Sequence, residues 1–100
     1  MAKKTDKKTF YSVEVALWDG SQFDADEDIQ YYGNYFDAEE AFDRAAKDMY
    51  HQFETGYDSA EILVYENHTI DGTRICTIEG KNLAGETDTC KVKFRKLTMN

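Results

Sequence analysis

The first ordered pattern in the chain is a hydrophobic residue at every second position. Between Phe10 and Trp18, one side of an extended segment carries Tyr11, Val13, Val15 and Leu17, and the other carries Ser12, Glu14 and Ala16. A period of two is typical of a strand with one buried face. We therefore expect a strand over residues 10–18, ended by the turn signal Asp19-Gly20.

A helical period begins further along the chain. Asp37 at the N-cap and Glu40 at the third helical position resemble a capping box. Gly56 suits the left-handed position that follows a helix. This pattern predicts an amphipathic helix over about residues 38–54, whose hydrophobic face is formed by Ala41, Phe42, Ala45, Met49 and Phe53.

Three later segments have the composition of strands. Residues 60–66 are rich in β-branched and aromatic side chains, and residues 74–79 and 89–97 alternate. Asp71-Gly72 is the signal for a two-residue type I′ turn, so the first two of these strands are expected to form a hairpin.

The register of this hairpin depends on its loop length. With a two-residue turn, Tyr65 faces Ile78 and Leu63 shares their side. An odd-length loop instead places Ile62 and Val64 on that side. The sequence leaves both registers open.

Residues 21–36 are ambiguous. The segment Asp24 to Asp28 is a poor strand and a poor helix interior, whereas Ile29 to Tyr32 suits a short strand stopped by Gly33. If this strand pairs with the first one, the acidic stretch is a hairpin loop. Otherwise the segment is a loop of roughly 16 residues, a length that is often functional.

The order strand, (strand), helix, strand, strand, strand predicts an α+β fold, with one amphipathic helix packed on a four- or five-stranded antiparallel sheet. Residues 1–8, with four lysines, are expected to be a flexible basic arm, and residues 9–100 a single domain.

Length and composition exclude several classes of protein. With 100 residues, the chain is too short for a dinucleotide-binding enzyme or a kinase, and 41% hydrophobic residues are too many for a chain disordered throughout. No secretory signal or apolar run of about 20 residues is visible, so the expected compartment is the cytoplasm.

Charge is distributed unevenly along the chain. The net charge is -8, yet residues 1–8 and 81–100 are each net basic. Between Asp19 and Asp43 there are nine acidic residues and no basic one. An acidic block of this kind either forms a solvated face or binds a basic partner, and it disfavours direct binding of nucleic acid.

Candidate chemistry is sparse. Asp24, Asp26 and Asp28 have the spacing that opens a calcium loop, but Ile29 and Tyr35 stand where an EF-hand needs glycine and glutamate. His51 and His68 lack metal-ligand spacing, and neither has a nucleophile motif around it. The expectation is a non-enzyme without a metal or cofactor.

Cys76 and Cys90 are expected on neighbouring strands. If the turn between them centres near Leu83, they lie directly opposite each other, in a geometry that permits a disulfide. We favour two reduced core thiols, which behave as small hydrophobic residues.

The last predicted strand has a basic side. Lys91, Lys93 and Arg95 alternate with Cys90, Val92 and Phe94, so they face solvent or a partner. Lysines of this kind commonly protect an edge strand, and they could also attract the acidic block of a neighbouring copy.

Aromatic residues are dense within the acidic block. Trp18, Phe23, Tyr31, Tyr32, Tyr35 and Phe36 are too many for one helix and a small sheet to bury, so some should be exposed among carboxylates. Exposed aromatic rings supply contact area in binding hot spots, and the acidic residues around them steer a basic partner.

The leading hypothesis is a non-catalytic binding or inhibitor protein that engages a basic surface of a partner protein. In size and charge the chain resembles small acidic inhibitors of phage or mobile-element origin, including anti-restriction and anti-CRISPR proteins, although no family motif is present. That resemblance implies a nucleic-acid-binding partner, of nuclease or polymerase type, whose groove is occupied by carboxylates. An immunity protein that masks a basic toxin would use the same mechanism. The candidate partner-binding residues are Asp24, Asp26, Glu27, Asp28, Tyr31, Tyr32, Tyr35, Glu39, Glu40 and Asp43.

The alternative hypothesis is a self-associating structural or assembly component. The basic last strand and the acidic block are complementary in charge, and an edge strand can add to the sheet of a neighbouring copy.

Overall fold

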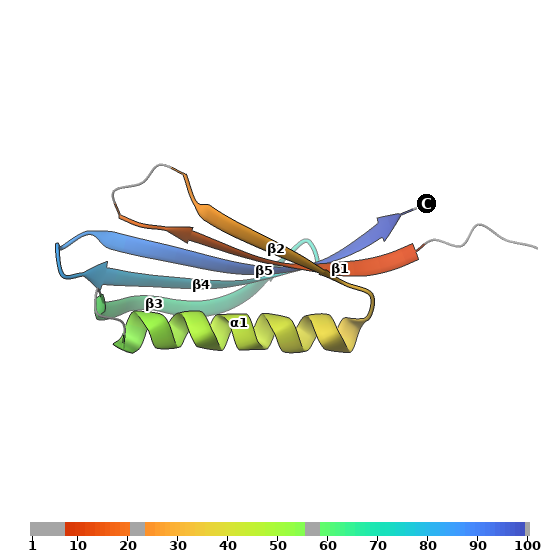
Figure 1. Cartoon of the computed structure of the whole chain (residues 1–100), viewed down its shortest axis with the longest axis horizontal. Helices are drawn as coiled ribbons and strands as arrows, with labels where there is room; N and C mark the ends of the chain where they lie inside the picture. Colours follow the sequence, from red (N-terminus) through yellow and green to blue (C-terminus); the bar gives the residue numbers. More distant parts are fainter. Residues whose placement is uncertain (1–7, 21–23, 56–58, 100) are drawn as a thin grey trace, which may run out of the picture.

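The computed structural model describes residues 8–20, 24–55 and 59–99, and these form one helix and five strands. The strands make one antiparallel sheet in the order β2-β1-β5-β4-β3, with the helix against one face (Figure 1). This confirms the predicted α+β fold and its element order. In chain order the elements are β1 (Lys8–Trp18), β2 (Asp26–Tyr32), α1 (Tyr35–Thr55), β3 (Ser59–Ile70), β4 (Thr73–Asn82) and β5 (Thr87–Met99).

The core lies between α1 and the three central strands. Phe42 of α1 packs edge-on against Phe94 of β5, with ring centroids 6.0 Å apart. Ile78 and Val92 beneath the helix are fully buried. β5 therefore follows the predicted alternation, with hydrophobic side chains toward the helix and polar ones on the open face of the sheet. In β4 the alternation is broken at Arg74, which lies on the helix side over the Phe42 ring.

The helix begins three residues earlier than expected. Asn34 is the N-cap: its Oδ1 accepts a hydrogen bond from the backbone N–H of Asp37 at 2.8 Å, and its Nδ2 donates to the Asp37 carboxylate at 2.9 Å. The assignment of Asp37 and Glu40 as cap and third helical residue was therefore wrong. An asparagine three residues before an acid is itself a capping signal. Gly56 lies outside the described residues.

The acidic segment is mostly strand. Residues 26–32 pair with β1, which confirms the hairpin alternative, but Asp26, Glu27 and Asp28 lie in the strand and not in its loop. The expectation of a poor strand here was wrong because β2 is the edge of the sheet. All its side chains except that of Tyr32 are exposed, so the carboxylates remain hydrated.

The last strand lies at the centre of the sheet. β5 pairs with β1 on one side and with β4 on the other, so its interpretation as a lysine-protected edge was wrong. Lys91, Lys93 and Arg95 lie on the open face, opposite Ala16, Glu14 and Ser12 of β1. Alternation fixed which way these side chains point, but it does not fix the order of strands in a sheet.

The turn between β4 and β5 displaces the two cysteines from each other. Cys76 lies opposite Val92, and Cys90 lies opposite Ile78, so the thiols are diagonal neighbours and the directly opposed pair was wrong. Asn82 organises the turn, since its Oδ1 accepts hydrogen bonds from the backbone N–H groups of residues 84 and 86. This centres the turn one residue later than assumed.

The β3–β4 hairpin combines features of both open registers. Tyr65 lies opposite Ile78, as a two-residue turn requires. A register irregularity between Ile62 and Val64 then turns Ile62 toward the core, whereas Leu63, expected there, is 47% exposed. The irregularity has the effect of a β-bulge, which reverses the side to which the following residues point.

Candidate functional site

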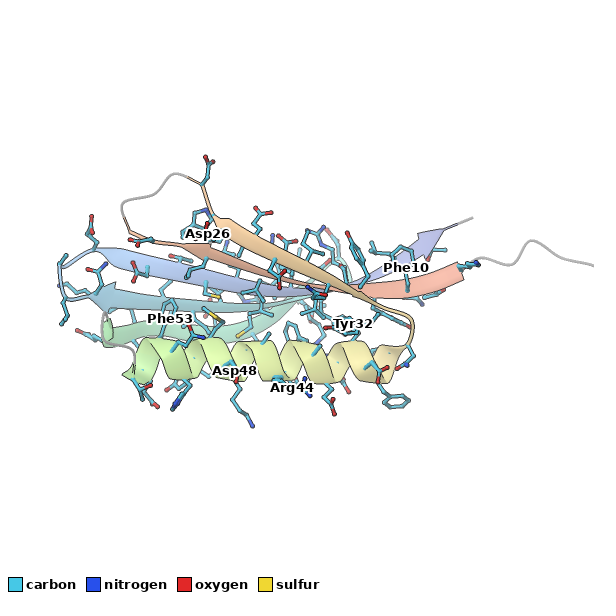
Figure 2. The ribbon with its side chains drawn as sticks, in the orientation of Figure 1. Phe10, Asp26, Tyr32, Arg44, Asp48 and Phe53 are labelled. Carbon is cyan, nitrogen blue, oxygen red and sulfur yellow. The ribbon has the colours of Figure 1, made fainter. Side chains whose placement is uncertain are left out.

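An acidic groove runs between β2 and α1. Its volume is about 220 Å³, and Asp28, Tyr32, Arg44 and Asp48 are among its lining residues. Asp26 pairs with Leu17 and Asp28 with Val15, so both aspartates lie on the side of β2 that faces the helix. Figure 2 shows Asp26 and Tyr32 towards opposite ends of β2, with Arg44 and Asp48 on α1. Asp28 and Asp48 line the groove, and Asp26 lies on the same side of β2 beyond that lining. We call these three aspartates the acidic groove residues.

One cation lies within this surface. Arg44 forms an ion pair with Glu40, one helical turn away, with a nitrogen–oxygen distance of 2.9 Å. Both side chains are largely exposed, so the pair contributes little to stability. The ion pair holds the Arg44 guanidinium beside the groove. Arg44 is thereby paired with Glu40 and not with the aspartates of β2.

Glu27 and Tyr31 lie on the opposite face of the sheet. Alternation along β2 points them away from α1, and Tyr31 is 63% exposed. Its ring lies 6.1 Å from that of Phe10, between centroids. Asp24 is exposed before β2 begins. These three predicted residues therefore do not form one contact surface with the acidic groove residues.

Glu39 and Asp43 face the other side of the helix, where they meet Arg74. The Arg74 guanidinium lies 3.3 Å from Glu39 and 3.9 Å from Asp43, between nitrogen and oxygen atoms. It also lies 4.8 Å from the centre of the Phe42 ring, a cation–π distance. Sequence analysis missed Arg74, although it is one of only three basic residues between positions 9 and 80.

The tyrosines near the helix start are partly structural. The Tyr35 ring packs against Tyr11 and Phe94, with centroids 5.8 Å and 5.5 Å away. Its hydroxyl donates a hydrogen bond to Glu39 at 2.9 Å, which raises the pKa of the Tyr35 phenol. Tyr32 is partly buried against the core. Phe36 beside them is 79% exposed, so the exposed aromatic area includes a residue outside the predicted set.

The ten predicted residues thus divide among three surfaces. Asp28 and Tyr32 line the acidic groove with residues of α1, and Asp26 lies on the same side of β2. Glu40 pairs with Arg44 of the groove. Tyr35, Glu39 and Asp43 surround Arg74. Asp48, which the sequence offered only as a possible addition to the acidic surface, lies in the groove, as does Arg44. Helical spacing could have found it, because it lies four residues after Arg44 on the same face.

Metal chemistry gains no support from the described residues. Among them, no group of three His, Cys, Asp or Glu side chains has a geometry that could hold a metal ion. Asp26 and Asp28 stand two residues apart on an extended strand, which separates them by about 6.6 Å. A calcium loop instead folds its ligands around the ion.

The cysteines lie where nucleophilic chemistry is disfavoured. Both are free and fully buried. Burial raises the pKa of Cys76, and it raises the pKa of Cys90 to about 12. Thiolates are the reactive form of cysteine, so both side chains serve the core.

No described helix has the length and hydrophobicity needed to cross a membrane. Comparison with models of protein families, with curated proteins and with solved structures gave no match in any of the three searches. The arrangement of charge and exposed side chains therefore carries the functional argument.

Proposed function

We propose that the protein is a non-catalytic binding protein whose acidic side engages a basic surface of a partner protein. The observation that carries this proposal is the separation of charge between the two sides of the sheet. Asp26, Asp28 and Asp48 lie on the helix side. The open face carries Lys91, Lys93 and Arg95, with Glu14 and Glu27 beside them, so it is the more basic of the two sides. A basic partner is attracted to the first side in preference to the second.

Local charge strengthens this separation. α1 contains six acidic and two basic residues, and β2 contains three acidic residues and no basic one. The two elements approach each other where β2 leads into the start of α1 (Figure 1), so their fields add over the acidic groove there. Exposed carboxylates on rigid elements do not need to be ordered when a partner binds, which favours affinity.

The basic surface best suited to this arrangement is a nucleic-acid-binding groove. Lysine and arginine side chains in such a groove are placed to meet a row of phosphates. Carboxylates on β2 and α1 would occupy those positions and compete with the nucleic acid. The partner is then a nuclease, a polymerase or a related enzyme, and binding inhibits it.

A pull-down from host-cell lysate tests the proposal. The immobilised protein is incubated at about 50 mM salt, washed, and eluted at increasing ionic strength, with mass spectrometry of each fraction. We expect a nucleic-acid-binding protein that elutes as salt screens the charges and that is displaced by added DNA or RNA. Affinity that is unchanged between low and high salt contradicts the proposal.

Two triple variants with the same net charge test which surface binds the partner. The first, Asp26→Asn with Asp28→Asn and Asp48→Asn, neutralises the acidic groove residues. The second neutralises three exposed glutamates elsewhere, Glu61→Gln with Glu66→Gln and Glu86→Gln. We expect the first to weaken binding at least about tenfold and the second to have a much smaller effect. Equal losses would show that net charge alone drives binding.

Self-association remains the second candidate function. Because β5 is central, assembly through an edge strand has to use β2 or β3. The two edges differ enough to choose between them.

A further inference from the structure

β3 is an edge strand whose second half, residues 65–70, has little of the usual protection, because its register irregularities lie between Ser59 and Val64 and its one acid there is Glu66. It pairs with β4 alone, so the backbone N–H and C=O groups of alternate residues point away from the sheet. Leu63, Tyr65 and Ile70 are 47%, 48% and 55% exposed along it. The segment Ser59–Ile70 contains no Lys, Arg or Pro, which commonly protect an edge from pairing with another chain.

The second half of this edge stands beside an open groove. The groove has a volume of about 470 Å³ and lies between β3 and α1. Tyr65, Asn67 and Thr69 line it from the strand, and Asp43 and Lys47 line it from the helix. The helix therefore leaves residues 65–69 of the edge accessible to a further strand.

We propose that β3 pairs antiparallel with β3 of a second copy of the chain, about a two-fold axis at Asn67. The pairing joins two five-stranded sheets into one continuous sheet and places both helices on the same face. It supplies partners for the outward backbone groups of both strands, as in strand addition between chains. The interface is isologous, because each copy contributes the same residues.

Polar pairing across the two-fold axis favours this register. In antiparallel pairing about Asn67, Glu66 of each copy lies opposite His68 of the other. Within one chain these side chains already approach to 3.9 Å, between oxygen and nitrogen. A two-fold axis at Glu66 would instead place two glutamates opposite each other, which disfavours that register.

The groove wall is self-complementary as well. Asp43 and Lys47 lie four residues apart on α1 and carry opposite charges. The two-fold axis sets the two helices antiparallel, so Lys47 of one copy comes toward Asp43 of the other. A second copy therefore meets the mixed charge of this wall, although the chain as a whole has a net charge of -8.

Cross-linking of Asn67→Cys tests the two-fold axis directly. Cys76 and Cys90 are fully buried, so the introduced thiol is the accessible one. With oxidised glutathione, the introduced thiols of two copies form a disulfide while glutathione disulfide is reduced to two thiols. Opposed residues in an antiparallel pair have Cα atoms about 4.5–5.5 Å apart, which suits a disulfide. We expect most of the variant to migrate as a covalent dimer on a non-reducing gel.

Ile29→Cys is the matched control on the opposite edge. Ile29 is 41% exposed, close to the exposure of Leu63 and Tyr65. We expect little covalent dimer from it. Equal cross-linking at both edges, or cross-linking at residue 29 alone, contradicts the proposal.

Sedimentation velocity of the unmodified protein measures the association without a covalent bond. We expect a dimer that weakens about fivefold in Asn67→Lys, because the two lysines face each other. Salt should change the dimer little, because it screens both the repulsion between two acidic chains and the attraction between Asp43 and Lys47, whereas it should clearly weaken binding to a basic partner. The two proposals can therefore fail separately. A strictly monomeric protein overturns the dimer, and a monomer that loses a captured protein in Asn67→Lys assigns the edge to that protein instead.

Discussion

The two edges of the sheet expose a strand in different ways. β2 has seven residues and carries three consecutive acids, whereas β3 has twelve residues and three exposed hydrophobic side chains. Charge keeps β2 hydrated and discourages another chain from adding to it. β3 carries only two acids, Glu61 and Glu66, along twelve residues, so its second half is less protected. The comparison suggests a division of roles, in which β2 offers charged side chains and β3 offers its backbone.

The edges also differ in how closely the helix packs beside them. Gly80 of β4, opposite Ile62 of β3, is buried beneath Phe53 near the end of α1. A Cβ atom at Gly80 would lie 2.8 Å from Cδ2 of Phe53 and 3.3 Å from the carbonyl oxygen of Glu61. At Gly33, just after β2, a Cβ atom would meet nothing within 4 Å. The β3 side therefore tolerates less added volume.

The largest predicted effect follows from this difference in packing. Gly80→Ala should lower the free energy of unfolding by about 1–3 kcal/mol, because Phe53 must move and the Glu61 backbone cannot easily do so. Gly33→Ala should change it by less than about 0.5 kcal/mol. Urea denaturation of both variants measures the difference, and equal losses would show that the two sides are packed alike.

Two adjacent tyrosines test whether β2 contributes to the core. Tyr32 packs against the core on the helix side, and Tyr31 is 63% exposed on the other side. Tyr32→Ala should lower the free energy of unfolding by about 1–2 kcal/mol, and Tyr31→Ala by less than about 1 kcal/mol. Thermal unfolding measures both. A reversed order would place the buried face of β2 on the open side of the sheet.

Most of the fold could be predicted because periodicity reports directly on buried faces. The alternation in β1 and β5 and the helical spacing of Phe42 and Phe53 gave each element and its inward side. Strand order could not be predicted in this way, because β5 has the same alternation at the centre of a sheet as it would have at an edge. β2 was obscured because an edge strand with hydrated side chains has no hydrophobic face to detect.

The candidate site was harder to predict than the fold. Acidic residues adjacent in sequence, such as Glu27 and Asp28, point to opposite faces of a strand, so a run of charge does not make one surface. Helical spacing places Asp48 on the face of Arg44, but its approach to Asp28 of β2 depends on the packing of α1 on the sheet. The approach of Arg74 to the helix depends on the same packing. Nothing in the sequence between β2 and α1 fixed that packing.

The helix cap that follows β2 carries a smaller predicted effect. Asn34→Ala should lower the free energy of unfolding by about 1 kcal/mol, because the backbone N–H of Asp37 loses its acceptor. Asp37→Asn keeps the shape of the side chain and should lose less, about 0.5 kcal/mol or under, from the charge at the helix start. Paired denaturation curves distinguish the two. A larger loss at Asp37 would return the cap to the position that the sequence pattern suggested.

The smallest predicted effect concerns the centre of the sheet, which both edges flank. Cys90 of β5 has its pKa raised from 9.0 to about 12 by burial, so the folded state keeps its proton where the unfolded state loses it. The unfolded state then binds fewer protons, and stability falls as the pH rises above about 9. The loss should be roughly 0.5–1 kcal/mol between pH 8 and pH 9.5. Cys90→Ala should be less stable at every pH because of its cavity, but its stability should decline less steeply over this range. Parallel curves for the two proteins would show that the alkaline loss comes from groups other than Cys90.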